Sequence, residues 1–149
     1  MGKIGSIKVE GIDEVVRELE RRQGNLREAL EAIVLAGGEV IRQAAISRSD
    51  GKIAANMTKE PISKSAKRIE VGIGPSRREW YARLIETGTG AHTVKRKRAK
   101  ALNIGQMGFR ALMQHPGMKA RPFLRPALDE NGDAAQAAIA DEAKKALDL

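Results

Sequence analysis

The shortage of aromatic residues sets the strongest limit on how this chain can fold. Only four of its 149 residues are aromatic, namely Trp80, Tyr81, Phe109 and Phe123. A chain of this length buries roughly 70% of the surface that it exposes when unfolded, so it can support a true core. That core must be built mainly from alanine, leucine, isoleucine and valine. The length favours a single domain over residues 1–149.

Apolar residues recur at helical spacing in two long stretches. The first covers residues 25–47 and starts with a capping-box pattern. The Gly37-Gly38 pair inside it weakens the helix by up to about 2 kcal/mol relative to two alanines, and it lets another backbone approach closely. The second stretch begins near Pro122 and runs to residue 147, with a soft point at Asn131-Gly132.

Between these helices the sequence predicts short elements and two loops. Residues 68–74 alternate apolar and polar side chains, as a half-buried strand does. Ser76 is placed to cap a short helix that Gly88 ends. Further expected elements are a helix at 13–22 and strands at 6–10, 101–104 and 109–114.

Two polar stretches, residues 48–67 and 91–100, show no apolar periodicity, so we expect long, mobile loops there. The elements together predict an α+β fold. In that fold a long N-terminal helix and a C-terminal helix pack on a small, mostly antiparallel sheet.

The chain offers few residues for catalysis or metal binding. It contains no cysteine, which excludes disulfides, thiolate zinc sites and cysteine nucleophiles. Its two histidines, His92 and His115, lie in different predicted loops, and neither a nucleophile elbow nor a P-loop is present. We therefore predict no catalytic residue, no cofactor and no metal site. No apolar run approaches the roughly 20 residues of a membrane span, so we expect no membrane partner.

Positive charge is concentrated in the middle of the chain. Lysine and arginine total 27 against 19 acidic residues, which gives a formal net charge of +8. Residues 92–126 contain nine of these bases and no acid, whereas both ends are rich in acid. Such a distribution suits nucleic-acid phosphates or an acidic surface on another protein. Base stacking within the basic run is disfavoured, because no aromatic residue lies between Glu86 and Gly108.

Two stretches carry a resemblance to a known protein family. One is Val71-Gly-Ile-Gly followed by Trp80-Tyr-Ala-Arg-Leu-Ile-Glu-Thr-Gly-Thr89, and the other is His115-Pro-Gly followed by Ala120-Arg-Pro-Phe-Leu-Arg-Pro-Ala-Leu128. Together they resemble the tail-completion, or head–tail joining, proteins of long-tailed bacteriophages and prophages. This is the HK-ninety-seven gene-product-ten-like family, akin to minor tail protein Z of lambda. The resemblance spans about residues 10–147 and departs from the family pattern over residues 56–65.

The resemblance implies a structural protein without enzymatic activity. Such a protein is made in the bacterial host cytoplasm and is placed in the virion at the junction of tail and head. It implies self-association into a ring, of six copies in the family, on assembly. The partners are then a tail terminator or tube protein and a head-closure or connector protein. A basic nucleic-acid-binding module is the alternative function, and non-specific contact with DNA stays open for the basic run.

These considerations give two sets of candidate residues. For the assembly interface we expect Glu86, Gly88, Thr89, Lys95, Arg96, Lys97, Arg98, Arg121 and Arg125. As structural anchors we expect Trp80, Tyr81, Pro122, Phe123, Leu124 and Pro126. Within the second set, Phe123 and Leu124 are expected to hold the last helix on the sheet.

Overall fold

The computed structural model describes residues 12–21, 26–62, 69–95, 102–103, 109–110 and 112–146. Contacts divide the chain into two compact units. The first unit combines the residues up to Trp80 with those from Phe123 onward, and the second spans Tyr81–Pro122. The predicted α+β class is confirmed, because both units contain helices and antiparallel strand pairs. The single domain over residues 1–149 stays a prediction.

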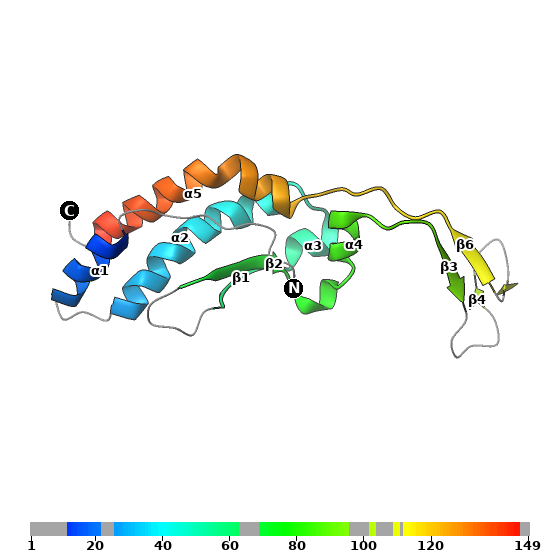
Figure 1. The fold of residues 1–149 in the computed structure, drawn as a ribbon, viewed down its shortest axis with the longest axis horizontal. Coiled ribbons are helices and arrows are strands. Elements are labelled where there is room, and N and C mark those ends of the chain that lie inside the picture. The colour runs from blue at the N-terminus through cyan, green and yellow to red at the C-terminus, as the bar shows by residue number, and fades with distance from the viewer. Residues whose placement is uncertain are drawn as a thin grey trace. The chain divides into compact units, whose positions relative to one another are not determined.

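Two long helices form the larger part of the first unit (Figure 1). α2 spans Leu26–Ser47 and α5 spans Leu124–Ala146, and the two pack along each other. Both helices confirm the stretches predicted from apolar periodicity. The backbone of α5 is non-helical at Asn131, which confirms the soft point there. The helix predicted at residues 13–22 is present as α1, Ile12–Arg21, whereas the strand predicted at residues 6–10 lies outside the described residues.

The Gly37-Gly38 pair places α2 between α5 and a strand pair. A Cβ atom on Gly37 would lie 2.6 Å from Cγ1 of Ile139 and 2.9 Å from the Ala135 carbonyl oxygen. A Cβ atom on Gly38, the next residue, would lie 3.1 Å from Cγ1 of Val71 in the strand pair. The predicted close backbone approach is therefore confirmed at Gly37. The last helix lies along α2, and α2 lies on the strands (Figure 1).

The strand pair of the first unit consists of β1, Met57–Pro61, and β2, Val71–Pro75, in antiparallel register. A short helix α3, Gly51–Ala55, leads from α2 to β1. The loop predicted over residues 48–67 is therefore wrong for residues 51–61, while residues 63–67 lie outside the described ranges. β1 shows no apolar pattern in the sequence because only its Met57 is buried. The strand forms through its pairing with β2. β2 confirms the strand predicted over residues 68–74.

The core of the first unit is aliphatic, as the composition predicts. Phe123 is the largest of the fully buried side chains and is 1% exposed. The other buried apolar residues in the described part of this unit are aliphatic: Leu30, Ile33, Ile41, Ala45, Ile53, Met57, Ala127, Ala135 and Ile139. None of the helices in the described ranges combines the length and apolarity needed to cross a bilayer.

The helix predicted after Ser76 is present in two pieces. The first piece is η1, a 3-10 helix at Arg77–Glu79 in the first unit. The second piece is α4, Ala82–Thr87, in the second unit. Gly88 ends α4 with a φ of 71°, which confirms its predicted role.

Four short strands follow in the second unit. These are β3 (His92–Lys95), β4 (Leu102–Asn103), β5 (Phe109–Arg110) and β6 (Leu112–His115). β3 pairs with β6 and β4 with β5, both antiparallel, so the described strands form three two-stranded sheets and not one small sheet. The strands predicted at 101–104 and 109–114 are confirmed in their described parts. The loop predicted over residues 91–100 is wrong for β3, and residues 96–100 lie outside the described ranges.

Candidate functional site

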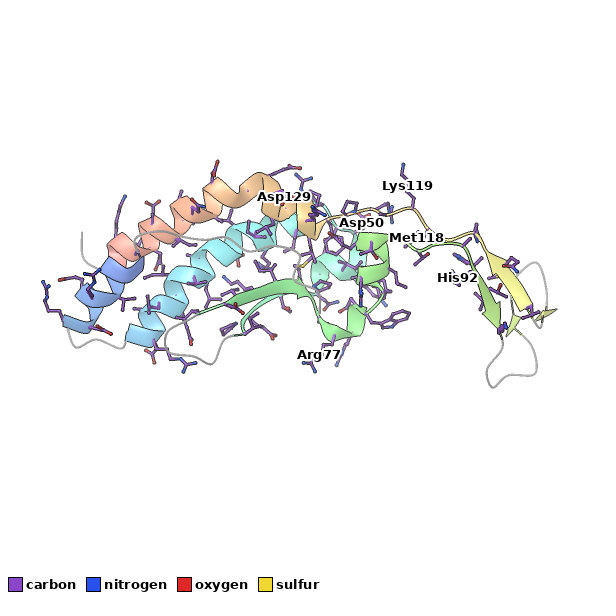
Figure 2. All side chains as sticks on the ribbon, viewed as in Figure 1. Asp50, Arg77, His92, Met118, Lys119 and Asp129 are labelled. Carbon is purple, nitrogen blue, oxygen red and sulfur yellow. The ribbon has the colours of Figure 1, made fainter. Side chains whose placement is uncertain are left out.

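The second unit contains a two-stranded ribbon, which is the main candidate for a functional surface. We call residues 88–95 and 112–121, together with β4 and β5, the ribbon. Near α4 the two segments are joined by a bridge between Thr89 and Met118, which exchange two backbone hydrogen bonds of 2.9 Å each. Beyond the bridge the pairing runs from His92 opposite His115 to Lys95 opposite Leu112. Figure 2 labels Met118 and Lys119 in the second segment and His92 in the first.

Two glycines allow the two segments to approach closely at the end of the ribbon next to α4, which we call its root. Gly88 has a φ of 71°, and a Cβ atom there would lie 2.7 Å from the Met118 carbonyl oxygen. Gly117 has a φ of 90°, and a Cβ atom there would overlap the Thr89 carbonyl oxygen. Side chains other than hydrogen are excluded at both positions by conformation and by space. The Arg121 N–H also donates a 2.8 Å hydrogen bond to the Ile85 carbonyl oxygen, which fastens the second segment to α4.

The two histidines meet across the ribbon, although the sequence places them in separate predicted loops. Their rings are stacked, with centroids 5.0 Å apart and an interplanar angle of 28°. Nδ1 of His92 donates to the Gly90 carbonyl oxygen at 2.9 Å, and Nδ1 of His115 accepts from the Gly117 N–H at 3.0 Å. Both rings thus bind the backbone beside them and stabilise the ribbon. No group of three or more potential metal ligands occurs within the described ranges.

The described side chains of β3 and β6 are mostly exposed. In β3 only Val94 is half-buried, and in β6 only Met113 and His115 are. Leu112 is 57% exposed, and Lys95 opposite it is exposed as well. An isolated pair of strands is at best marginally stable in water. A surface on another molecule would therefore stabilise the ribbon by covering its apolar side chains.

The charge of the ribbon is of one sign. Residues 88–122 contain eight lysines and arginines and no acidic residue. Lys95, Lys119 and Arg121 are exposed. The ribbon therefore presents positive charge with no carboxylate of its own to neutralise it, and it suits an anionic surface.

The predicted interface residues have different environments. Gly88 and Thr89 act through their backbone at the root of the ribbon. Glu86 is only 9% exposed at the end of α4, so its side chain is not on an exposed surface as the sequence predicts. Arg125 is exposed in α5 and lies 3.7 Å from a carboxylate oxygen of Asp129. Residues 96–98 of the predicted interface lie outside the described ranges.

The predicted anchors divide into buried and exposed residues. Phe123 is buried just before α5, and Leu124 and Pro126 are half-buried in its first turn. Tyr81 is half-buried, and Pro122 is exposed. Trp80 is 73% exposed, so its prediction as an anchor is wrong. η1 is a 3-10 helix, which winds more tightly than the α-helix that the sequence predicts, so its residues face other directions. Glu79 is therefore buried in the place expected for Trp80.

A polar cluster of Asn56, Ser76 and Glu79 next to η1 is not among the residues predicted from the sequence. Glu79 is 7% exposed, and its carboxylate accepts hydrogen bonds from Nδ2 of Asn56, at 3.1 Å, and from the Ser76 hydroxyl. The Ser76 hydroxyl oxygen in turn accepts from the Arg78 N–H, at 3.4 Å, which confirms its predicted capping role. Ser76-x-x-Glu79 has the spacing of a capping box, but Glu79 binds the Ser76 hydroxyl and Asn56 here, and the Ser76 N–H donates to the Asn56 carbonyl oxygen.

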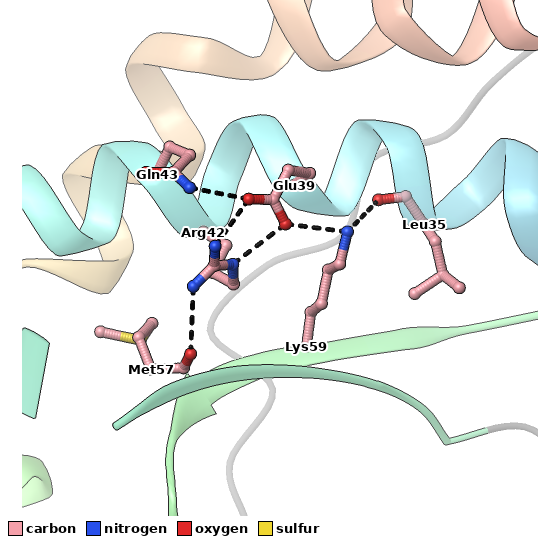
Figure 3. A network of polar contacts seen from close by, with 6 residues as sticks. All are labelled: Leu35, Glu39, Arg42, Gln43, Met57 and Lys59. Atoms are coloured by element: carbon pink, nitrogen blue, oxygen red, sulfur yellow. Dashed lines mark hydrogen bonds and ion pairs between the residues drawn. The ribbon is translucent and has the colours of Figure 1, made fainter. Parts of the chain in front are cut away.

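A second polar network joins α2 to β1 (Figure 3). Glu39 accepts hydrogen bonds from Arg42, at 2.7 and 3.0 Å, and lies 2.8 Å from the Lys59 ammonium group. Arg42 also donates to the Met57 carbonyl oxygen, at 3.3 Å. The hydrogen bonds of Arg42, followed by those of Lys59, hold the pKa of the Glu39 carboxyl well below its ordinary value. This network fixes the strand pair on the helix.

Three features make the ribbon the candidate surface of this chain. Its strands have exposed edges, and its exposed side chains are cationic with a few apolar ones. Gly88 and Gly117 let its two segments approach closely at the root. Comparisons with protein-family models, with curated proteins and with solved structures find no match to this chain.

Proposed function

We propose that this chain is a structural, non-enzymatic protein of a tailed bacteriophage or prophage virion. It completes the tail and joins it to the head as part of a ring at the tail–head junction. One observation carries the proposal: the two stretches that resemble tail-completion proteins meet at the root of the ribbon. The first runs through α4 to Thr89, and the second leads from His115 through the ribbon into α5. Backbone hydrogen bonds join them between Thr89 and Met118 and between Ile85 and Arg121.

The ribbon is the part of the chain that attaches to a neighbouring virion protein. Its charge complements an acidic surface on a tail-tube, tail-terminator or head-closure protein. Exposed ion pairs contribute under about 1 kcal/mol each, so they guide docking, while the covered apolar area supplies most of the affinity. Fixing the ribbon on a partner costs conformational entropy. The free protein is therefore monomeric or weakly associated until a tail end or a head connector is present.

Deletion of the gene from a phage that carries it tests this function. Full heads and complete tails are expected to accumulate separately, because the joining step is lost. The wild-type gene supplied in trans is expected to restore joined particles, which electron microscopy counts directly. Joined and infectious particles in the deletion strain would contradict the proposal.

A nucleic-acid-binding module is the second candidate, and the acid-free ribbon is the observation that favours it. Binding to phosphates releases counterions, so the affinity would fall steeply with salt in proportion to the phosphates neutralised. Titration of the purified protein with duplex DNA at several salt concentrations measures that slope. Nanomolar binding to a defined site at physiological salt would establish this function in place of the junction role.

A further inference from the structure

The turn that carries Trp80 presents an exposed aromatic side chain between arginines. Trp80 is the only tryptophan of the chain, and at 73% it is the most exposed of the large apolar side chains in the described ranges. Arg77 and Arg78, in η1, are exposed, and neither forms an ion pair with any described residue. Tryptophan and arginine are the residue types enriched at the energetic centres of protein interfaces.

Hydrogen bonds of Glu79 and Ser76 hold the same turn in place. The Glu79 carboxylate binds Asn56 and Ser76, and the Ser76 N–H donates to the Asn56 carbonyl oxygen at 3.0 Å. Because the carboxylate faces inward, the outward charge of the turn is that of its two arginines. A rigid turn loses little conformational entropy on binding, so more of its contact energy appears as affinity.

An acidic surface that complements the turn lies on α5 of the same unit. Asp133, Ala137 and Ala140 are exposed and follow one another at spacings of four and three residues, so they share one side of the helix after Asn131, and Asp129 is exposed in the turn before that residue. Asp133 forms no ion pair with any described residue, and Asp129 lies 3.7 Å from an Arg125 side chain that is itself 73% exposed. The alanines beside the two carboxylates leave space for a large side chain.

The basic turn and the acidic helix lie on opposite sides of the first unit. Figure 2 shows Arg77 on one side of the unit and Asp129 on the other, with α2 and the strands between them. A copy that used both surfaces would bind a different neighbour through each one. Such head-to-tail contacts build a ring where the rotation between copies closes.

We propose that the turn of Arg77, Arg78 and Trp80 docks on the α5 surface of Asp129, Asp133 and Ala137 in a second copy of this chain. The contact rests on the proposed function and deepens it, because it supplies the interface between neighbouring subunits of the ring. A protein partner is favoured over single-stranded nucleic acid, since sequence-independent stacking uses successive aromatic side chains and this turn exposes one.

Cysteine cross-linking tests the contact, because the natural chain has no cysteine. An Arg77→Cys protein is mixed with an Ala137→Cys protein under oxidising conditions. The mixture is expected to give several-fold more cross-linked dimer than either protein alone, since the contact joins two different surfaces. The matched control replaces the first protein by Ile62→Cys, whose natural side chain is 59% exposed elsewhere on the same unit. A yield no higher than that of the control mixture would overturn the proposal.

Fluorescence of the single tryptophan provides an independent readout. With rising protein concentration at low salt, Trp80 emission is expected to move to shorter wavelength as the side chain becomes covered. The double variant Asp129→Lys, Asp133→Lys is expected to lose this shift, and mixing it with Arg77→Glu, Arg78→Glu is expected to restore it. Emission that stays unchanged at concentrations where sedimentation shows the chain to self-associate would overturn the contact. If the contact fails but the gene deletion still leaves heads and tails separate, the junction function stands. Failure of the contact can therefore be told apart from failure of the proposed function.

Discussion

Thr89 and Met118 each donate a backbone hydrogen bond to the other's carbonyl oxygen, both 2.9 Å long. The bridge lies beside Gly88 and Gly117, whose positive φ angles and missing side chains permit the approach. The two stretches on which the functional proposal rests meet at this point. The bridge joins the two segments of the basic ribbon at the end that lies next to α4.

Gly117→Ala is expected to open the root of the ribbon. A residue other than glycine at this φ costs roughly 1–3 kcal/mol, and the new Cβ would also overlap the Thr89 carbonyl oxygen. Amide hydrogen exchange at Thr89 and Met118 should become faster. The matched control is Gly90→Ala, where a Cβ meets nothing within 4 Å and φ is not positive. Equal protection in the two variants would contradict the assigned geometry.

Phe123→Ala is expected to destabilise the protein strongly, whereas Trp80→Ala is expected to leave its stability almost unchanged. Phe123 is 1% exposed, so its removal should lower the free energy of unfolding by about 3–5 kcal/mol. Trp80 is 73% exposed, so its removal should change that free energy by less than about 0.5 kcal/mol. Denaturant unfolding followed by circular dichroism measures both. A silent Phe123 variant would contradict its role as the anchor before α5.

The long helices are predictable from the sequence because their apolar spacing is a local property. In α2 and α5 the spacing persists over many turns, and the glycine pair and Asn131 indicate the close approach and the kink in advance. The capping role of Ser76 is predictable for the same reason, because it depends on residues within one turn.

β1 and β3 are not predictable in this way. Each buries few side chains and depends on a partner strand elsewhere in the chain, so no alternation of apolar residues marks it. The meeting of His92 and His115 follows only from that pairing. Trp80 shows a further limit, since aromatic residues are usually buried and a short 3-10 turn was enough to expose this one.

Glu39→Gln is expected to destabilise the first unit in a pH-dependent manner. The loss at neutral pH should be roughly 1 kcal/mol, because solvent screens a side chain that is 35% exposed. The folded pKa of Glu39 is lowered, so its stabilisation is present above the unfolded pKa and is lost as pH falls toward the folded value. The difference between wild type and variant should therefore shrink below about pH 4.

Thermal unfolding at a series of pH values measures this difference. Glu31→Gln on the same helix is the control, because its partner Arg27 is 55% exposed and the pair should contribute only about 0.2–0.5 kcal/mol. A Glu39 effect that grows as the pH falls would contradict the network as described.

Gly37→Ala is expected to destabilise the contact between α2 and α5, even though alanine is the better helix former. The new Cβ would lie 2.6 Å from Ile139 and 2.9 Å from a backbone oxygen, so the helices must separate at a cost of about 1–3 kcal/mol. Gly132→Ala is the control, because its Cβ would meet nothing within 4 Å. If the two substitutions have the same effect on the melting temperature, the close approach is wrong.

The most direct measurement of the central claim is electron microscopy of particles made with a chain that lacks the ribbon. Deleting residues 91–116 joins Gly90 to Gly117, so a two-residue Gly-Gly turn can close the strand pair between Thr89 and Met118. The first unit should unfold as it does in the wild type. In a phage whose own gene is deleted, this variant is expected to leave heads and tails separate, whereas the full chain joins them. Joined particles with the shortened chain would contradict the claim that the ribbon attaches this protein at the junction.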